Sequence, residues 1–351
     1  MMNEIGKFSF DLIEKLVYSK LGAERAEVLV GPGAGRDNAV IQLKGGQVLI
    51  ATADPLSVIP ALGFKDSAYI SVHLLASDLV TCGFAPQFFM VNFNLPPQMS
   101  DDEFEEYWRT IDAECRKLDV AIVGGHTGRY EGSDYTVVGG GVMMAVVPEN
   151  RYVASTMARP GDVIMMTKGV AIATTGILSR VFPQTVKKTF GFDFLKKAQR
   201  YLDDFSVVED ALISATVGLR DDGVTSMHDV TEGGLLGALY ELSEASNTGL
   251  EVDLSKVIVT EEAKQICQLF KISPYTTLSE GTLLLTVKAE MASAVQQVLD
   301  LKGIKNAAIG KITDAQQDRW IIGEDKRELL KKPAADPYWK AYWTACHEGW
   351  K

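Results

Sequence analysis

The spacing of hydrophobic and polar residues along the first half of the chain predicts a mixture of helices and strands. Apolar residues recur at the helical spacing over 66–82. Ser100, followed three residues later by Glu103, forms a capping box ahead of a second helix. The other elements expected in this half are an amphipathic helix over 8–21, a hairpin over 39–54 around a Gly-Gly turn, a strand over 86–95, a short buried strand over 120–127 and a long strand over 135–147.

Three consecutive glycines, Gly139, Gly140 and Gly141, interrupt the last of these strands. Glycine inside a strand marks either a bulge or the close approach of another backbone. Beyond them the pattern starts again with a turn cluster. The elements expected there are a buried strand over 163–169 and helices over 170–182, 192–203 and 206–219, followed by alternating strands and helices.

This restart divides the chain into two domains, 1–155 and 156–323, and a tail over 324–351. The length of 351 residues suits two domains better than one. The tail is rich in lysine, proline and aromatic residues, including Trp339 and Trp350. Because large aromatic side chains gain most from burial, we expect them to dock the tail onto the body of the protein rather than to bind a ligand.

Composition and charge narrow the class of protein. Hydrophobic residues make up 46% of the chain, and 35 basic against 46 acidic side chains give a formal net charge of -11. This balance argues against nucleic acid or an anionic membrane as a partner, and a polyanionic substrate would need a metal ion to approach. The four cysteines are widely spaced, no signal peptide is recognisable, and no apolar run approaches the ~18 residues of a membrane span. We therefore expect a cytoplasmic protein with reduced thiols.

Four aspartates lie at the edges of elements or beside glycines: Asp37, Asp54, Asp78 and Asp229. A small number of carboxylates suits Mg²⁺, which prefers hard oxygen ligands and keeps several waters. Each aspartate also has a plainer interpretation. Asp229 could be an N-cap, Asp54 a turn former before proline, and Asp78 part of a solvated helix face.

Other residues indicate how an anion is held. Gly233 and Gly234, at the start of a helix, would leave backbone N–H groups free to face a phosphate. Lys168 ends a buried strand, where an ammonium is costly unless an anion lies nearby, and this favours contact with phosphate. His126 lies in the turn Gly-Gly-His-Thr-Gly, where a structural hydrogen bond and a catalytic role both stay open.

Other nucleotide-binding and catalytic motifs are absent from the sequence. No GxxxxGK[ST] P-loop occurs, and the glycine-rich segment over 31–38 lacks the GxGxxG spacing and precedes a strand instead of following one. The four histidines have no zinc-ligand spacing, and no GxSxG nucleophile motif is present.

Six segments in order resemble a known superfamily. They are RDNAV, TAD, SDLVTCGFAP, VGGHT, PGDVIMMTKG and HDVTEGGLLGAL, running from position 36 to position 239. They resemble the PurM-like superfamily of aminoimidazole ribonucleotide (AIR) synthetase, which includes the hydrogenase maturation factor HypE, selenophosphate synthetase and thiamin-monophosphate kinase. The Gly-Gly-His-Thr and Thr-Lys-Gly forms look most like HypE-like, AIR-synthase-related proteins.

The resemblance implies an α+β protein with a two-domain PurM-like fold. An N-terminal α/β domain over 1–155 would bind ATP and dimerise through its sheet, and a C-terminal α+β domain would follow over 156–323. The dimer would be a homodimer whose N-terminal sheets pair around a central barrel, with ATP at the dimer cleft.

The resemblance also assigns roles to residues. The acids matching Asp37, Asp54, Asp78 and Asp229 hold Mg²⁺ in these families and, through it, the triphosphate of ATP. The glycine loop that contains Gly33 and Gly35 closes over the nucleotide. The other positions implied are Gly124, Gly125, Thr127, Gly233 and Gly234 for nucleotide binding, and His126 and Lys168 for catalysis.

The shared chemistry of the superfamily is phosphorylation of a carbonyl-type or amide oxygen by ATP, assisted by a metal ion. This chain departs from HypE because five residues follow Cys346 where HypE ends in cysteine, and Ala173 stands where relatives often carry an acid. We expect an ATP- and Mg²⁺-dependent enzyme that activates a carbonyl or amide oxygen of an unidentified small-molecule or protein-borne acceptor, with hydrogenase maturation as a candidate pathway. The alternatives are a catalytically altered nucleotide-binding scaffold or sensor, and a metabolite kinase or synthetase.

Overall fold

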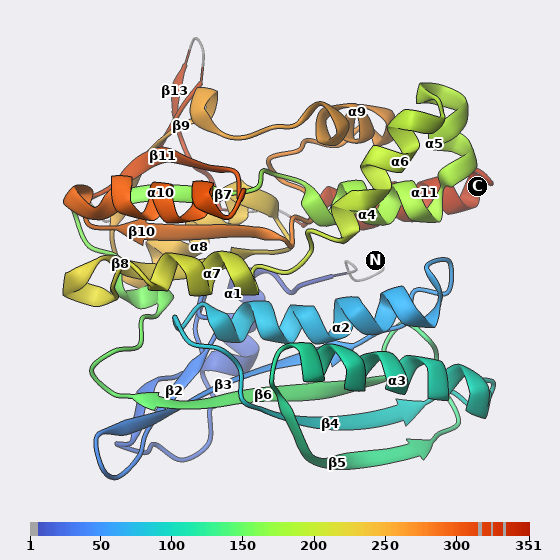
Figure 1. The fold of residues 1–351 in the computed structure, drawn as a ribbon, viewed down its shortest axis with the longest axis horizontal. Coiled ribbons are helices and arrows are strands. Elements are labelled where there is room, and N and C mark those ends of the chain that lie inside the picture. Colours follow the sequence, from blue (N-terminus) through green and yellow to red (C-terminus); the bar gives the residue numbers. More distant parts are fainter. Residues whose placement is uncertain (1–5, 315–317, 324–325, 333–334) are drawn as a thin grey trace.

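The computed structural model describes residues 6–314, 318–323, 326–332 and 335–351, and its strands form two separate sheets (Figure 1). The first sheet has the strand order β1-β2-β3-β6-β4-β5. Its strands are β1 (Val28–Val30), β2 (Ala39–Gln42), β3 (Gln47–Leu56), β4 (Phe88–Leu95), β5 (Ala121–Arg129) and β6 (Gly139–Pro148). Neighbours in this sheet are antiparallel, except that β4 and β5 run parallel. The expected hairpin is confirmed as the pair β2 and β3.

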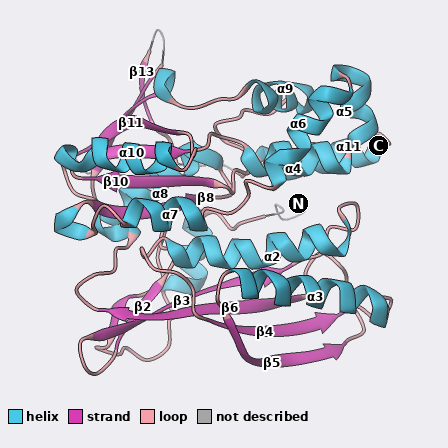
Figure 2. Cartoon of the chain, in the orientation of Figure 1, coloured by secondary structure: helices cyan, strands magenta, loops and turns pink. Residues whose placement is uncertain are grey.

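Two helices, α2 (Gly63–Val80) and α3 (Asp101–Lys117), cover one face of this sheet (Figure 2). Along β4 exposed and buried residues alternate strictly, so one face packs on the helices and the other stays open. The predicted capping box is confirmed: the N–H of Glu103 donates to the Ser100 hydroxyl, and the N–H of Ser100 donates to the Glu103 carboxylate.

The glycines of β6 let neighbouring groups approach closely. A Cβ at Gly139 would lie 2.0 Å from the carbonyl oxygen of Asn92, and one at Gly141 would lie 2.5 Å from the ring of Phe89. β6 pairs with β3 and with β4 without a shift of register. Of the two interpretations of these glycines, close approach is therefore confirmed and a bulge is not.

Two expectations for this half are wrong. The strand over 120–127 is expected to be buried, but β5 is an edge strand and is mostly exposed, because β4 alone pairs with it. The helix over 8–21 is expected to be continuous, but α1 (Phe10–Ile13) passes into the π-helical turn η1 (Glu14–Tyr18), and neither has a buried residue. A short helix depends on packing for stability, and this segment has little of it.

The second sheet has the strand order β13-β12-β9-β11-β7-β10-β8. Its strands are β7 (Val163–Thr167), β8 (Val224–Val230), β9 (Gly249–Asp253), β10 (Thr282–Val287), β11 (Asn306–Thr313), β12 (Arg319–Ile322) and β13 (Arg327–Leu329). Although β8 lies at the edge of this sheet, all of its residues are buried. The reason is that β8 contacts both α2 of the first domain and α8 (Gly234–Ser246).

Helices cover both faces of the second sheet. Met166 of β7 packs in one cluster with Leu239 of α8, whereas the adjacent Met165 packs with α7 (Val208–Ala215) and α10 (Ala292–Leu301) on the other face. Burial on both faces explains why β7 and β10 read as continuous apolar runs in the sequence. The remaining helices are α4 (Ile172–Val181), α5 (Pro183–Phe190), α6 (Phe192–Gln199), α9 (Glu261–Phe270), α11 (Pro337–His347) and the short 3₁₀ turns η2 (Ser155–Met157), η3 (Arg200–Leu202), η4 (Arg220–Asp222), η5 (Leu254–Lys256) and η6 (Ala289–Met291).

The C-terminal tail packs on the second domain, as its aromatic residues predict. Tyr338 of α11 is buried, and the ring of Trp350 lies against Phe182 and Phe270. The N–H of Thr185 donates to the backbone oxygen of Lys351. Among the described residues, no helix is both long and apolar enough to cross a membrane.

Candidate active site

The four predicted aspartates converge from four different elements. Asp229 lies near the end of β8, Asp78 in the last turn of α2, Asp54 within β3, and Asp37 in the loop between β1 and β2. Ligand atoms of Asp37, Asp229 and the neighbouring His228 all lie within 4.8 Å of one another. The hydroxyl of Thr52, two residues before Asp54, donates to Asp78 at 3.0 Å. The side chains of Asp54 and Asp78 interact directly, and the charges of Asp37 and Asp229 act on Asp78, so the four acids, far apart in sequence, form one cluster.

The crowding of these acids in a buried space changes their pKa values. Burial raises the pKa of Asp229 to about 7, and the charge of Asp37 adds to the effect. Burial, followed by the charges of Asp229 and Asp54, raises the pKa of Asp78 well above its usual range. Burial also raises the pKa of Asp54. Carboxylates held this closely favour the charged form only if a cation joins them.

Two oxygens of the cluster are buried and have no hydrogen-bond partner among the described residues: Asp37 Oδ2 and Asp229 Oδ1. A buried carboxylate oxygen without a partner is costly, so it indicates that something else binds there. Hard oxygen donors at this spacing fit Mg²⁺. These residues could therefore hold the magnesium ion that the sequence predicts.

The structure contradicts the alternative interpretations of three aspartates as an N-cap, part of a solvated helix face and a turn former. The N-cap residue of α8 is Gly233, not Asp229. Asp78 accepts a hydrogen bond inside the cluster instead of lying on a solvated helix face. Asp54 lies within β3, opposite Gly141 of β6, and not in a turn.

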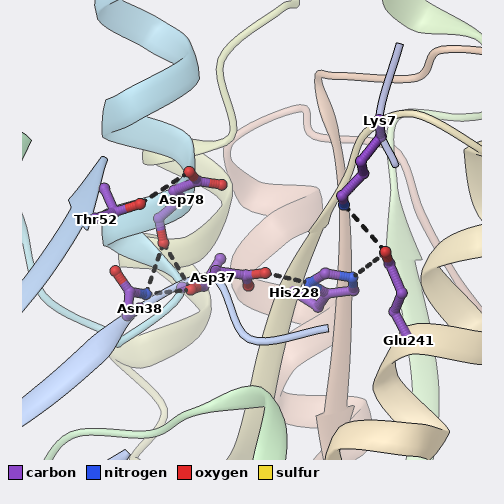
Figure 3. Close-up of polar contacts among 8 residues, drawn as sticks. Lys7, Asp37, Asn38, Thr52, Asp78, His228 and Glu241 are labelled. Carbon is purple, nitrogen blue, oxygen red and sulfur yellow. Dashed lines mark hydrogen bonds and ion pairs between the residues drawn. The ribbon is translucent and has the colours of Figure 1, made fainter. Parts of the chain in front are cut away.

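His228 belongs to the site, although the sequence gives no indication of its partners. Its Nδ1 lies 2.6 Å from Asp37 Oδ1, and its Nε2 lies 3.1 Å from Glu241 Oε2 on α8 (Figure 3). Burial alone would lower the pKa of His228, but Asp37 and then Glu241 outweigh it and raise that pKa well above the usual value. Because both ring nitrogens face carboxylates, His228 holds Asp37 in position, and neither nitrogen is turned toward an open space.

The glycine loop is held against both domains. The side-chain amide of Asn38 donates to the backbone oxygen of Asp78 and to the hydroxyl of Thr81, each at 2.8 Å (Figure 3). Gly35 has a φ of +66°, and a Cβ there would lie 2.3 Å from the backbone oxygen of Glu241. Glycine is thus required at Gly35, and the loop places Asp37 between α2 and α8.

The expectation of free amides at Gly233 and Gly234 is wrong for this conformation. The N–H of Gly233 donates to Asp336 Oδ2 at 2.8 Å, and the N–H of Gly234 donates to the backbone oxygen of Thr231. Asp336, just before α11, also accepts from the N–H of Tyr338. A carboxylate of the tail therefore occupies the start of α8, where the sequence suggests a phosphate.

Lys168 also has a protein anion as its partner. Its ammonium lies 2.8 Å from Asp210 of α7 and donates to the backbone oxygen of Ser206. It lines a cavity of about 950 Å³ that none of the four clustered aspartates lines. The reasoning that a buried lysine needs an anion is confirmed by the contact with Asp210, and contact of Lys168 with a phosphate stays a prediction.

The segment with His126 lies away from the acids within one chain. Gly125 of β5 is opposite Val91 of β4, which is opposite Gly141 of β6, which is opposite Asp54 of β3. Three strand spacings separate Gly125 from Asp54, roughly 14 Å. His126 Nε2 lies 2.7 Å from the hydroxyl of Tyr130, which matches the structural reading of this histidine. The site roles of Gly124, Gly125, His126 and Thr127 stay predictions.

Glu280 is a further acid that the sequence reasoning missed. It lies two residues before β10, at the end of the sheet where Leu283 pairs with Asp229, and the charges of Glu232 and Asp229 both act on it. Its Oε2 is buried without a partner, and burial raises the pKa of Glu280 well above its ordinary value. Burial of this kind disfavours the charged form of the carboxyl group. Its only sequence signal is its place before Gly281, which has a φ of +99°.

Comparison with known proteins identifies the family of the chain. A profile of the AIR synthase related protein, N-terminal domain, matches residues 35–146, and one of the C-terminal domain matches residues 159–323. The chain is 24% identical to a putative hydrogenase expression/formation protein of Methanocaldococcus jannaschii, over 95% of this chain and 96% of that protein. It is 25% identical to carbamoyl dehydratase HypE of Azotobacter vinelandii, over 81% of this chain and 80% of that protein.

Solved structures share the fold. A chain in the crystal structure of a HypE–HypF complex has a TM-score of 0.71 at 20% identity, covering 92% of this chain and 99% of that chain. The hydrogenase maturation protein HypE in complex with ATP has a TM-score of 0.63 at 18% identity, covering 95% of this chain and 97% of that chain. The two-domain PurM-like α+β fold expected from the sequence is confirmed. The chain belongs to the family of AIR synthase related proteins.

Proposed function

We propose that the protein is an ATP- and Mg²⁺-dependent enzyme that phosphorylates a carbonyl or amide oxygen of an acceptor. The observation that carries this proposal is the aspartate cluster, where Asp37 and Asp229 each have a buried oxygen that no group in the described part of the chain contacts by a hydrogen bond. A relative named carbamoyl dehydratase and a structural relative in complex with ATP support chemistry of this kind. The hydrogenase-related names of the relatives support maturation of a hydrogenase as the pathway.

Different residues of the site would have different roles in this reaction. Asp37, Asp78 and Asp229 would hold the cation, which neutralises phosphate charge when it is bound. His228 fixes the orientation of Asp37 through the 2.6 Å contact at Nδ1. Glu280 lies at the same end of the sheet as Asp229, its pKa is raised by burial, and it would exchange a proton with the acceptor or leaving oxygen.

Titration calorimetry tests this proposal. Mg²⁺–ATP is titrated into the wild type and into Asp37→Asn, Asp78→Asn and Asp229→Asn, and we expect each variant to bind about tenfold more weakly or worse. Asp112→Asn is the matched control, because Asp112 lies on α3 with 42% of its side chain exposed and, among the described residues, forms an ion pair with Arg116 alone. Unchanged affinity in all three variants would contradict both the proposed metal site and the proposed function.

One observation favours a second function, that of a nucleotide-binding scaffold or sensor. Cys346 is half-buried within α11, and burial raises the pKa of its thiol, so it is not a free terminal cysteine. Release of phosphate from ATP, with and without a panel of amide and carboxylate acceptors, separates the two functions. Turnover stimulated by one acceptor supports the enzyme, and if that acceptor is a small metabolite, it identifies a kinase or synthetase.

We also propose that the protein is a homodimer formed through the open face of the first sheet. Phe88, Met90 and Val123 expose 38%, 46% and 52% of their surface, and α2 and α3 lie on the opposite face (Figure 1). An exposed apolar surface of this kind is typical of an interface between proteins. Pairing through this face would bring β5, with His126, to the partner, where the resemblance places the ATP cleft.

We further propose that the protein works in the cytoplasm. All four cysteines are free thiols in the structure. Unpaired cysteines are typical of proteins that stay in a reducing compartment.

A further inference from the structure

The cavity that Lys168 lines has a volume of about 950 Å³ and is formed by both domains. Pro86 and Leu118 line it from the first domain, and Tyr201 and Thr260 line it from the second. A hollow of this size can hold a small organic molecule. Of the residues predicted to serve ATP, Mg²⁺ or catalysis, Lys168 alone lines this cavity. The cavity is therefore a candidate for a second site.

The charge of Lys168 is used by the protein itself. Its ammonium has three N–H donors. It lies 2.8 Å from Asp210 Oδ2, and it donates to the backbone oxygens of Ser206 at 2.5 Å and of Asp204 at 3.3 Å. In this conformation all three donors face protein oxygens, so Lys168 holds the segment 204–210 in place as one wall of the cavity.

This wall is electronegative around Asp204. The side chain of Asp210 is only 1% exposed, and its Oδ1 has no hydrogen-bond partner among the described residues. Burial raises the pKa of the lining residue Asp204, Lys168 opposes this effect, and the charge of Asp210 adds to it. A positively charged group of a ligand at Asp204 would stabilise both carboxylates.

Other parts of the lining are electropositive. Six of the lining residues are basic and five are acidic, so the cavity has a net positive charge in a chain whose net charge is -11. Lys117 and Lys168 form ion pairs with protein acids. Four other basic residues of the lining form none among the described residues: Lys197, Arg200, Lys302 and Lys305. Cations around a hollow that have no protein partner attract anionic groups.

We propose that this cavity is a second ligand-binding site, for a small acidic amino compound that carries one ammonium and two carboxylate groups. The ammonium binds at Asp204, and the carboxylates bind at the unpaired cations, among them Lys305, whose charge acts on Asp204. A simple anion would leave Asp204 without a counter-charge, and a simple amine would leave the cations without one. The proposal does not depend on the proposed function, because the aspartate cluster does not line the cavity.

Titration calorimetry with L-glutamate tests the proposal, and glutarate, which lacks the ammonium group, is the matched ligand. We expect the wild type to bind L-glutamate more tightly than glutarate. Lys305→Met should weaken the binding of both ligands about tenfold, because a charge-assisted contact with a carboxylate is lost. Asp204→Asn should weaken the binding of L-glutamate about tenfold and leave that of glutarate unchanged or tighter, since a like charge is removed.

L-alanyl-L-glutamate, which carries the same charged groups on a longer frame, distinguishes a short peptide from a free amino acid as the ligand. Lys264→Met is the control variant, because Lys264 is exposed on α9 and does not line the cavity. It should leave every affinity unchanged. Asp204 and Lys305 are exposed, so their variants should fold like the wild type, which urea unfolding checks.

Two results would overturn the proposal. One is a wild type that binds neither L-glutamate nor L-alanyl-L-glutamate, or that binds glutarate as tightly as L-glutamate. The other is a Lys305→Met variant whose affinity for Mg²⁺–ATP falls by the same factor as its affinity for L-glutamate, because the cavity would then belong to the nucleotide site. Failure of the wild type to bind Mg²⁺–ATP would contradict only the proposed function.

Discussion

Single residues in this site differ in how much of their role the sequence reveals. The four aspartates are predictable because each lies at an element edge or beside a glycine, where a side chain can reach a shared cleft. His228 is not, because its partner Asp37 lies 191 positions away, and the pairing exists only after two domains come together. Lys168 shows an intermediate case: its burial predicts an anion, but only the fold identifies that anion as Asp210.

At this scale we predict that Glu280→Gln separates binding from turnover. The amide keeps the shape of the buried carboxyl group but can neither take nor release its proton. Steady-state phosphate release should fall at least about 100-fold, while calorimetry should give a Mg²⁺–ATP affinity within about twofold of wild type. Glu209→Gln, at an exposed position of α7, should leave both quantities unchanged. Full turnover in Glu280→Gln would exclude Glu280 from proton transfer.

The elements were largely predictable from periodicity, and the failures have physical causes. The helix over 8–21 has an apolar stripe, but no core lies within its reach, so only α1 and η1 form. The apolar run Ala121–Val123 reads as a buried strand, yet its place at the edge of the sheet is set by pairing partners distant in sequence. Helices such as α3 were predicted well because their caps are local signals.

The close packing of Gly125 against β4 gives a prediction about the free energy of unfolding. A Cβ at Gly125, whose φ is +150°, would lie 1.6 Å from the carbonyl oxygen of Val91 in β4. Gly125→Ala should therefore force β4 and β5 apart and lower the free energy of unfolding by more than about 3 kcal/mol. Gly132→Ala is the control, since its φ is +85° but no atom lies within 4 Å of the added Cβ. That control should cost only about 1 kcal/mol in urea unfolding, from backbone strain. Equal costs would contradict the close approach.

The contact between α2 and α3 gives a prediction about pH. A hydrogen bond with His73, together with Lys117, lowers the pKa of Glu114 to about 2 from an ordinary 4.5, against the opposing effect of burial. Because the pKa of Glu114 is lower in the folded protein, the carboxylate stabilises the fold fully at a pH above its ordinary pKa of 4.5. This contribution is lost as the pH falls through the folded-state pKa of about 2.

The measurement is the urea midpoint as a function of pH for the wild type, Glu114→Gln and Glu105→Gln. Between the two pKa values the wild type should lose stability more steeply than Glu114→Gln, which has no proton to bind at this position. Glu105 is exposed on α3 and has no ion pair among the described residues, so its variant should follow the wild type. Parallel curves for all three proteins would show that Glu114 does not contribute.

For the whole molecule, the open face of the first sheet predicts a change of oligomeric state. Light scattering after size exclusion should give a dimer for the wild type and a monomer for Met90→Glu, because the substitution buries a charge at the proposed interface. Leu301→Glu is the control, since Leu301 is 85% exposed on α10 in the other domain. A wild type that is monomeric at all concentrations would contradict the dimer.

The two halves of the molecule share one continuous hydrophobic cluster, which contains Leu75 of α2, Met227 of β8 and Leu283 of β10. Cleavage of the backbone between the two sheets should therefore leave the two halves associated, because their separation would expose the apolar surface of this cluster to water. The two halves are therefore not expected to move as rigid bodies about a hinge. Opening to admit a ligand should come from the segments that cover the acids, and not from the lobes swinging apart.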